Sequence, residues 1–246
     1  AYETSCSLVG SEMCIRDSAV HVGATAAVQA IPSVLDETDR KEPRMRERAD
    51  ILYRPFEPGD FEAVAELMRA QWSCDLEGAA GEYSASIDLC GYLADADWGL
   101  VAEGRGQVLG AVLLRTDDEP DPKWAARRDM LMAEAAADPS LEEEIHRDVD
   151  ILEEEALLSD EYAQSDGIGN VAEIKLLIVS PAAQGLGMGG RLFGEAKRRA
   201  AELGGFYLLT DDSCDVGFYE HKGMRRMAKR CLLYTSDAAD ELDGVD

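Results

Sequence analysis

Four glycines stand within seven consecutive residues of this chain, and the pattern of a helix begins directly after them. Glycine has no Cβ atom, so the backbone at these positions can approach a ligand closely and direct its N–H groups toward it. The N-terminal end of the following helix adds a partial positive charge. Together these features are typical of a phosphate or pyrophosphate site, and a tight turn without a ligand is the simpler alternative. The stretch consists of Gln184, Gly185, Leu186, Gly187, Met188, Gly189 and Gly190.

Apolar segments on both sides predict the elements that position these glycines. Residues 176–179 are all apolar, which is typical of a strand buried on both faces, and Pro181 ends the run. A glycine pair ends the helix that follows, and residues 206–210 are predicted to form a second strand. The apolar face of the helix consists of Leu192, Phe193, Ala196, Ala200 and Leu203.

Three kinds of phosphate-binding loop are candidates for the glycine-rich stretch. A P-loop requires the string Gly-x-x-x-x-Gly-Lys-Ser/Thr, which the sequence lacks. A Rossmann loop places Gly-x-Gly-x-x-Gly directly after its strand. Here residues 180–184 separate the strand from the glycines, although Asp211 stands where the ribose-binding acid of that fold would be. A Rossmann-type oxidoreductase therefore stays as an alternative.

The third kind of loop matches best. Residues 184–189 resemble the Q/R-x-x-G-x-G/A loop of the GNAT superfamily of acetyl-CoA-dependent N-acetyltransferases, and residues 217–224 (GFYEHKGM) resemble its late motif. The resemblance covers about residues 51–230 of this chain. It implies a GNAT-like mixed α/β fold, acetyl-CoA as co-substrate and direct acetyl transfer to a bound acceptor. It also implies that the backbone of Leu177, Ile178 and Val179 binds the pantetheine arm and that residues 184–190 bind the pyrophosphate.

Acetyl transfer to an amine needs a base for the acceptor and an acid for the leaving thiolate. A lysine-like amine has a pKa near 10.4, so its deprotonation at pH 7 costs roughly 4–5 kcal/mol. Glu173 is the candidate base, because it is charged on an otherwise buried strand and resembles the placement of the base in histone-acetylating members of the family. Tyr219 matches the tyrosine that serves the family as general acid. The simpler alternatives are a salt bridge for Glu173 and a packed aromatic ring for Tyr219.

Both ends of the chain resemble translated sequencing-adapter DNA. Residues 12–18 read EMCIRDS and residues 231–236 read CLLYTS, and DNA strings that encode these two stretches are reverse complements of each other. We therefore expect residues 1–18 and 231–246 to be artefacts and the natural C-terminus to be missing. Residues 19–50 show no clear periodicity and are expected to form a disordered or non-native tail.

The composition excludes several other classes of protein. The chain has 246 residues and a net charge of −26, which argues against a nucleic-acid partner because phosphate backbones need a basic surface. It contains no run of eighteen apolar residues, so no membrane span is expected. The three histidines are scattered, which predicts no metal cluster. The three cysteines outside the flanks lack C-x-x-C spacing and are typical of a protein from a reducing cytoplasm.

The predicted domain extends over residues 51–230. A strand over 51–54 leads to a turn, and Asp60 is a suitable N-cap for the helix that follows. A second helix is predicted over 83–93 and a β-hairpin over 98–114. The first helix has an apolar stripe, which is interpreted as core, formed by Phe61, Val64, Leu67, Met68 and Trp72.

A long insertion, residues 116–170, stands between the third and fourth predicted strands, where a GNAT domain usually has a short turn. Pro122 begins one predicted helix, which ends at Ala137, and Ser140 with Glu143 forms the capping box of another. The insertion holds eighteen acidic residues against four Lys or Arg. It is either a solvated surface or a cover that attracts cationic substrates to the acceptor site.

The sequence thus predicts a cytoplasmic N-acetyltransferase with a GNAT-like mixed α/β fold and an acidic helical insertion. The acidic surface favours a small cationic amine, such as a polyamine or an aminoglycoside-like molecule, or a lysine side chain as acceptor. A non-catalytic module that senses a CoA ester is the alternative, and a homodimer is left open.

Overall fold

The computed structural model describes residues 22–30, 51–73, 76, 79–117, 119–141, 157, 172–210, 214 and 216–233, and for 22–30 and 226–233 it describes the backbone alone. The strands are β1 (Val22–Ala30), β2 (Ile51–Pro55), β3 (Trp98–Gly104), β4 (Gln107–Arg115), β5 (Ala172–Val179), β6 (Phe206–Thr210) and β7 (Met224–Leu233). The α-helices are α1 (Phe61–Trp72), α2 (Ala80–Asp95), α3 (Pro122–Ala136), α5 (Met188–Ala200) and α6 (Val216–His221). Among the described residues, every helix is too short or too polar to span a bilayer.

The seven strands form one mixed sheet in the order β2-β3-β4-β5-β6-β1-β7. All neighbours pair antiparallel except β5 and β6, which are parallel. The pairing between β5 and β6 extends over only three residues of β5, which are Ala172, Glu173 and Ile174. The predicted mixed α/β fold is confirmed. The Rossmann alternative requires a largely parallel sheet and is not compatible with this pairing.

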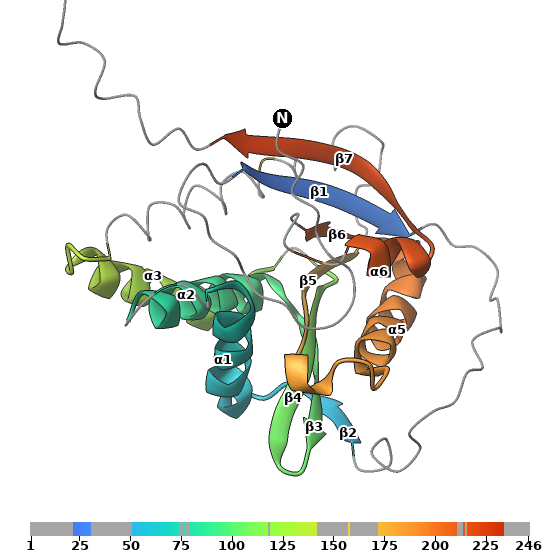
Figure 1. Cartoon of the computed structure of the whole chain (residues 1–246), viewed down its shortest axis with the longest axis horizontal. Helices are drawn as coiled ribbons and strands as arrows, with labels where there is room; N and C mark the ends of the chain where they lie inside the picture. The colour runs from blue at the N-terminus through green and yellow to red at the C-terminus, as the bar shows by residue number, and fades with distance from the viewer. Residues whose placement is uncertain are drawn as a thin grey trace, which may run out of the picture.

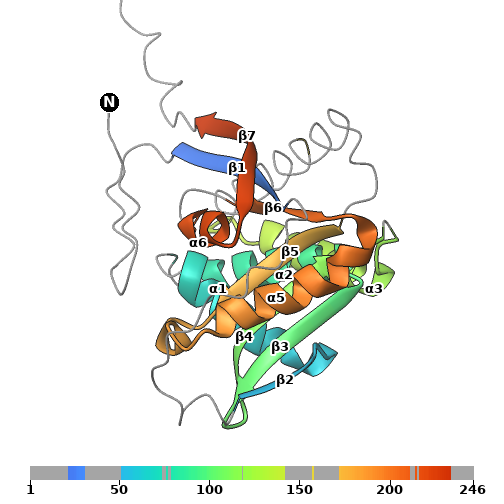
Figure 2. The ribbon, with the colours of Figure 1, turned by 90° about the vertical axis from the view of Figure 1, so that its right-hand side faces the viewer.

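Helices cover both faces of the sheet. In Figure 1 α1 and α2 lie on one side of β4 and β5, with α3 beyond them, and α5 lies on the other side. Figure 2 shows α5 running across β3, β4 and β5. One core layer forms where Phe61, Val64 and Met68 of α1 meet Leu113 and Ile178 of the sheet. The opposite layer contains Val112, Ile174, Leu192, Phe193 and Ala196.

The predicted unit of strand, glycine loop, helix and strand is confirmed as β5, α5 and β6. The apolar face of α5 is buried as predicted, with one exception. Leu203 is 37 % exposed, because α5 ends at Ala200 and a 3-10 turn over Ala201–Leu203 changes the angular position of this side chain. The first helix and the hairpin are also confirmed, the latter with Arg105 and Gly106 at positive φ in its turn.

Asp60 occupies the N-cap position of α1, but its side chain does not cap the helix. The carboxylate instead accepts two hydrogen bonds from the guanidinium of Arg54, at 2.8 and 2.7 Å, and one from the backbone N–H of Glu57 at 2.8 Å. The predicted capping role was therefore wrong. A charged donor from β2 competes more strongly for this carboxylate than the backbone of α1 does.

The first predicted helix of the insertion is confirmed as α3, whose N-cap Asp121 accepts a hydrogen bond from the N–H of Lys123. The second predicted helix lies largely outside the described residues. Residues 22–30 form β1, although the sequence predicts no regular element there. Alanine is depleted in strands, so this segment carries a weak local signal, and β1 is held by pairing with β6 on one side and β7 on the other. The last strand, β7, ends at Leu233, three residues into the C-terminal flank.

Candidate functional site

A cavity of about 470 Å³ lies beside the C-terminal half of β5, beyond the point where β5 stops pairing with β6. Beyond Ile174, β5 pairs with β4 alone, so the backbone edge of its C-terminal half faces the cavity instead of another strand. The cavity is lined by residues from α1, β5, the glycine loop, the start of α5 and α6. They are Gln71, Trp72, Leu177, Ile178, Val179, Ala183, Gln184, Gly185, Gly187, Met188, Gly189, Gly190, Cys214, Phe218 and Tyr219.

The glycine loop forms one wall of this cavity. Gly187, the N-cap of α5, has φ of 77°, a left-handed conformation that few residues other than glycine adopt without strain. For the N–H groups of Met188, Gly189 and Gly190, no acceptor is recorded within the described part of the chain. These are the first amides of α5, and a helix leaves such groups without intrahelical partners. The wall can therefore donate hydrogen bonds to an anion.

Nearly all the residues predicted to bind the cofactor are brought together here, with Leu186 as the exception. The predicted strand residues Leu177, Ile178 and Val179 line the cavity, as does the glycine loop. Leu186 instead packs, half-buried, against the core layer beneath α5. An apolar side chain in a polar loop gains more free energy from this burial than from contact with an anion.

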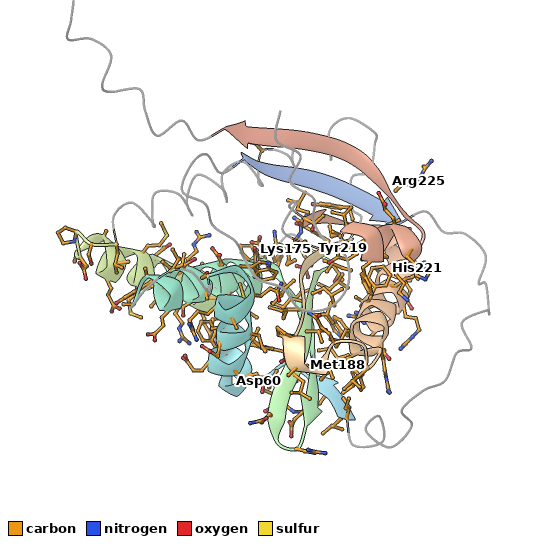
Figure 3. The ribbon with its side chains drawn as sticks, viewed as in Figure 1. Asp60, Lys175, Met188, Tyr219, His221 and Arg225 are labelled. Atoms are coloured by element: carbon orange, nitrogen blue, oxygen red, sulfur yellow. The ribbon has the colours of Figure 1, made fainter. Side chains whose placement is uncertain are left out.

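Phe218 and Tyr219 of α6 both line the cavity. Figure 3 labels Tyr219 on the side of α6 that faces β5. The two rings meet edge to face with centroids 5.3 Å apart, and Phe193 of α5 contacts both, at 5.9 Å from Phe218 and 6.2 Å from Tyr219. This aromatic cluster fixes α6 against α5. It thereby holds the Tyr219 ring at the edge of the cavity.

Two lining residues come from the C-terminal end of α1. Gln71 and Trp72 line the cavity together with the glycine loop. Trp72 also packs against the core, as the sequence pattern predicts. The helical stripe predicts which face of α1 is apolar. It carries no signal that the last turn of the helix also reaches a cavity.

The structure does not bring Glu173 to the lining of the cavity. Its side chain is buried, and it forms ion pairs with Arg115 at 2.9 Å and with Lys175 at 3.2 Å. Lys175 also pairs with Asp95 of α2 at 3.1 Å. Burial lowers the pKa of Lys175, but the attraction of Glu173 and Asp95 outweighs it and raises this pKa above its ordinary value. This geometry is the one that the salt-bridge interpretation of Glu173 predicts.

The described lining is poor in groups that could exchange protons. Tyr219 and Cys214 are its ionisable side chains, and none of the described lining residues is an Asp, Glu or His. Within the described ranges, no three His, Cys, Asp or Glu side chains gather as metal ligands. What the described cavity offers is backbone N–H groups, an apolar surface, two side-chain amides, one phenol and one thiol, which fits an extended anionic ligand with an apolar arm.

The comparisons with known proteins concern the fold alone. No family model and no curated protein matches the sequence. A conserved protein of unknown function from Staphylococcus epidermidis is similar in structure, with a TM-score of 0.51 and 12% identity over 87% of this chain. A putative GNAT acetyltransferase from Novosphingobium aromaticivorans gives 0.43 and 14% over 87%. This chain spans less than two thirds of the length of either protein, 62% and 64%. A GNAT acetyltransferase from Brucella melitensis in complex with acetyl-CoA gives 0.38 and 19%, with 75% and 88% of the two chains covered.

Proposed function

We propose that this chain is a GNAT-type N-acetyltransferase, which binds acetyl-CoA in the cavity and transfers its acetyl group to a primary amine. The observation that carries the proposal is the separation of β5 from β6 after Ile174, directly beside the glycine loop. The separation exposes a strand edge next to helix N-terminal amides that have no acceptor among the described residues. A CoA ester has both groups that such a site would bind, an amide-containing arm and a pyrophosphate.

Each part of the ligand has a proposed partner. The pantetheine arm contains two amides, and it would extend along Leu177, Ile178 and Val179 in the way that a peptide adds to a sheet edge. The pyrophosphate would accept hydrogen bonds from the amides of the glycine loop. A volume of about 470 Å³ lies within the range of small-ligand sites, roughly 300–1,000 Å³, and suits part of a CoA molecule.

The proposed reaction forms a C–N bond and breaks the C–S bond of the thioester. The neutral amine attacks the carbonyl carbon, and the attacking nitrogen loses one proton to solvent. The tetrahedral intermediate expels the thiolate, and the Tyr219 hydroxyl donates a proton to the sulfur and is reprotonated by solvent. Donation from a positioned acid typically contributes about 10²–10⁴-fold to such a step. Glu173 as the base stays a prediction that would need water molecules to carry the proton from the cavity, because the carboxylate lies outside the lining.

The charge of the insertion supports the proposed acceptor class. With eighteen acidic residues against four basic ones, the insertion produces a negative field that attracts cations. We therefore propose a small cationic amine or a lysine side chain as acceptor.

The direct test has two stages. Isothermal titration with CoA and acetyl-CoA measures binding, and thiol release from acetyl-CoA in the presence of a panel of polyamines, aminoglycosides and lysine peptides measures transfer. We expect binding of both ligands and thiol release with at least one amine. An absence of CoA binding would remove the basis of the proposal.

The second candidate is a non-catalytic sensor of CoA esters. It is favoured by one observation, that none of the described lining residues is a carboxylate or a histidine that could serve as base. A sensor would bind CoA with ordinary affinity and release no thiol with any amine, beyond the rate of acetyl-CoA hydrolysis alone. Turnover with any acceptor excludes this candidate.

A further inference from the structure

Glu173 lies at the centre of a network of four further side chains, which we call the Glu173 network: Asp95, Arg115, Glu173, Lys175 and Tyr207. The Tyr207 hydroxyl donates a hydrogen bond to Oε2 of Glu173 at 3.0 Å. Nη2 of Arg115 lies 2.9 Å from the same oxygen and donates to the Tyr207 hydroxyl at 2.8 Å. Three strands, β4, β5 and β6, thus meet at one carboxylate oxygen.

The other oxygen of Glu173 faces the α2 side of the sheet. Oε1 accepts a hydrogen bond of 3.2 Å from Nζ of Lys175, and the same ammonium lies 3.1 Å from Oδ2 of Asp95 at the end of α2. Lys175 is the extra residue of a bulge, because Leu113 pairs with Leu176 while Leu114 pairs with Ile174. The network therefore connects three adjacent strands to a helix, and it balances two positive charges with two negative ones.

The network occupies the point where the sheet divides. Glu173 and Tyr207 are directly opposite each other, as the middle one of the three residue pairs that join β5 to β6. Leu177, four residues after Glu173, already lines the cavity. Cys214, Phe218 and Tyr219, which follow β6 in the chain, also line the cavity. A change in the spacing of β5 and β6 at Glu173 would therefore move these residues relative to the β5 wall.

Burying these charges needs a physical reason, because ion pairs in a protein interior are often no more stable than apolar side chains of the same size. Glu173 and Tyr207 are 2 % and 3 % exposed. Apolar contacts are not directional, and three ladder pairs alone are a weak constraint on strand position. Hydrogen bonds of fixed length between opposite residues define both the register and the separation of the two strands.

We infer that the Glu173 network fixes the separation of β5 and β6, and that Tyr207 and Glu173 are positioning residues for the CoA ester rather than groups that exchange protons with the acceptor. This inference rests on the proposed function, because the proposed function assigns the ligand, a CoA ester, whose affinity depends on the separation of β5 and β6. The carboxylate of Glu173 at the start of β5 would then affect cofactor binding through the separation of the two strands. The base for the acceptor amine would then be another group or water.

Tyr207→Phe tests this inference, because it removes one hydroxyl and leaves the ring and the charges in place. We expect the Kd for CoA and the KM for acetyl-CoA to rise about tenfold, the factor that one hydrogen bond to a charged group typically contributes, while kcat changes less than about twofold. Tyr83→Phe, in a separate apolar cluster on α2, is the matched control and should leave both constants unchanged. An unchanged Kd in a folded Tyr207→Phe variant would overturn the inference and leave the proposed function standing.

Glu173→Gln separates a positioning residue from a base. The positioning role predicts a raised KM for acetyl-CoA, a nearly unchanged kcat and an unchanged pH dependence of kcat. A base predicts a loss of about 10²–10⁴-fold in kcat and a lost ionisation in the pH profile. The second result overturns the inference and supports the base. Circular dichroism shows whether Glu173→Gln folds. If Glu173→Gln does not fold, the Kd of the Tyr207→Phe variant for CoA tests the inference alone. If the wild-type protein does not bind CoA at all, the inference fails together with the proposed function.

Discussion

A Cβ atom added to Gly189 would lie 3.6 Å from Cγ2 of Val179, an ordinary van der Waals distance. The first turn of α5 and the last residue of β5 are thus separated by just enough space for a methyl group. The next nearest atom, Cζ of Phe218, would be 4.0 Å away. The absence of a side chain at this position is therefore not required by packing. It leaves the amides of the helix N-terminus open toward the cavity.

The first prediction concerns Gly189→Ala. The variant should fold with an unchanged or slightly higher melting temperature, because the methyl group fits and alanine favours a helix. Its Kd for CoA should rise about tenfold or more, because the methyl group keeps the pyrophosphate from approaching the amides and one charge-assisted hydrogen bond is lost. Titration calorimetry measures this change.

Gly194 provides the control on the same helix. A Cβ atom there would meet no atom within 4 Å. Gly194→Ala should raise the free energy of unfolding by about 0.5–1 kcal/mol through helix propensity alone and leave CoA binding unchanged. Equal binding by the two variants would show that the ligand does not contact the first turn of α5.

The second prediction concerns two thiols in different environments. Cys90 is fully buried between α2 and the sheet, and burial raises the pKa of its thiol to about 11. Cys214 lines the cavity and is half-buried. At pH 7.5 iodoacetamide should alkylate the peptide that contains Cys214 and spare the peptide that contains Cys90, since the thiolate is the reactive form.

Saturating CoA should slow the alkylation of Cys214, because both occupy the same cavity. Mass spectrometry of the digested protein follows each cysteine separately, and Cys214→Ser identifies its peptide. If CoA binds but leaves the rate at Cys214 unchanged, the ligand occupies a different site. If Cys90 reacts as fast as Cys214, the core beneath α2 opens on the timescale of the experiment.

The local parts of the site could be predicted from sequence because each has a short-range cause. Apolar residues at 176–179 define a strand, glycines at 184–190 permit the left-handed turn at Gly187, and the periodic apolar face of α5 defines a helix. Their order along the chain then places a loop between a strand end and a helix start. No knowledge of distant contacts is needed for any of these steps.

The remaining parts depend on contacts between distant segments, which periodicity does not encode. A charge on a buried strand marks Glu173 as unusual, but its partner Arg115 comes from β4 and its partner Tyr207 from β6. The position of Trp72 at the cavity depends on where α1 ends relative to the sheet. The strand at 22–30 depends on two neighbours almost two hundred residues away in the sequence.

The third prediction concerns the hydroxyl of Tyr219. Tyr219→Phe keeps the ring and its contacts with Phe193 and Phe218, so folding and the Kd for CoA should be unchanged. If the hydroxyl protonates the leaving thiolate, kcat should fall by about 10²-fold or more. Pre-steady-state thiol release measures this step directly. A kcat within about twofold of the wild type would leave Tyr219 with a packing role only.

The last prediction concerns stability in acid and the pair of Arg54 and Asp60. The two hydrogen bonds from the Arg54 guanidinium hold the pKa of Asp60 below its ordinary value, against the opposing effect of burial. The pair therefore stabilises the folded state at pH values above about 3.9, the ordinary value for an unfolded chain, and this contribution is lost as the pH falls through the lower pKa of the folded state.

Asp60→Asn should reduce the free energy of unfolding by about 1–3 kcal/mol at pH 7, because it removes a charge from a largely buried pair. The difference between wild type and variant should shrink as the pH is lowered from 4 toward 2, since protonation then removes the same charge from the wild type. Urea unfolding at a series of pH values measures both. Glu66→Gln removes an exposed partner of Arg69 and should change stability by less than about 0.5 kcal/mol at pH 7. A difference for Asp60→Asn that stays constant between pH 7 and pH 2 would mean that the lost charge is not the cause.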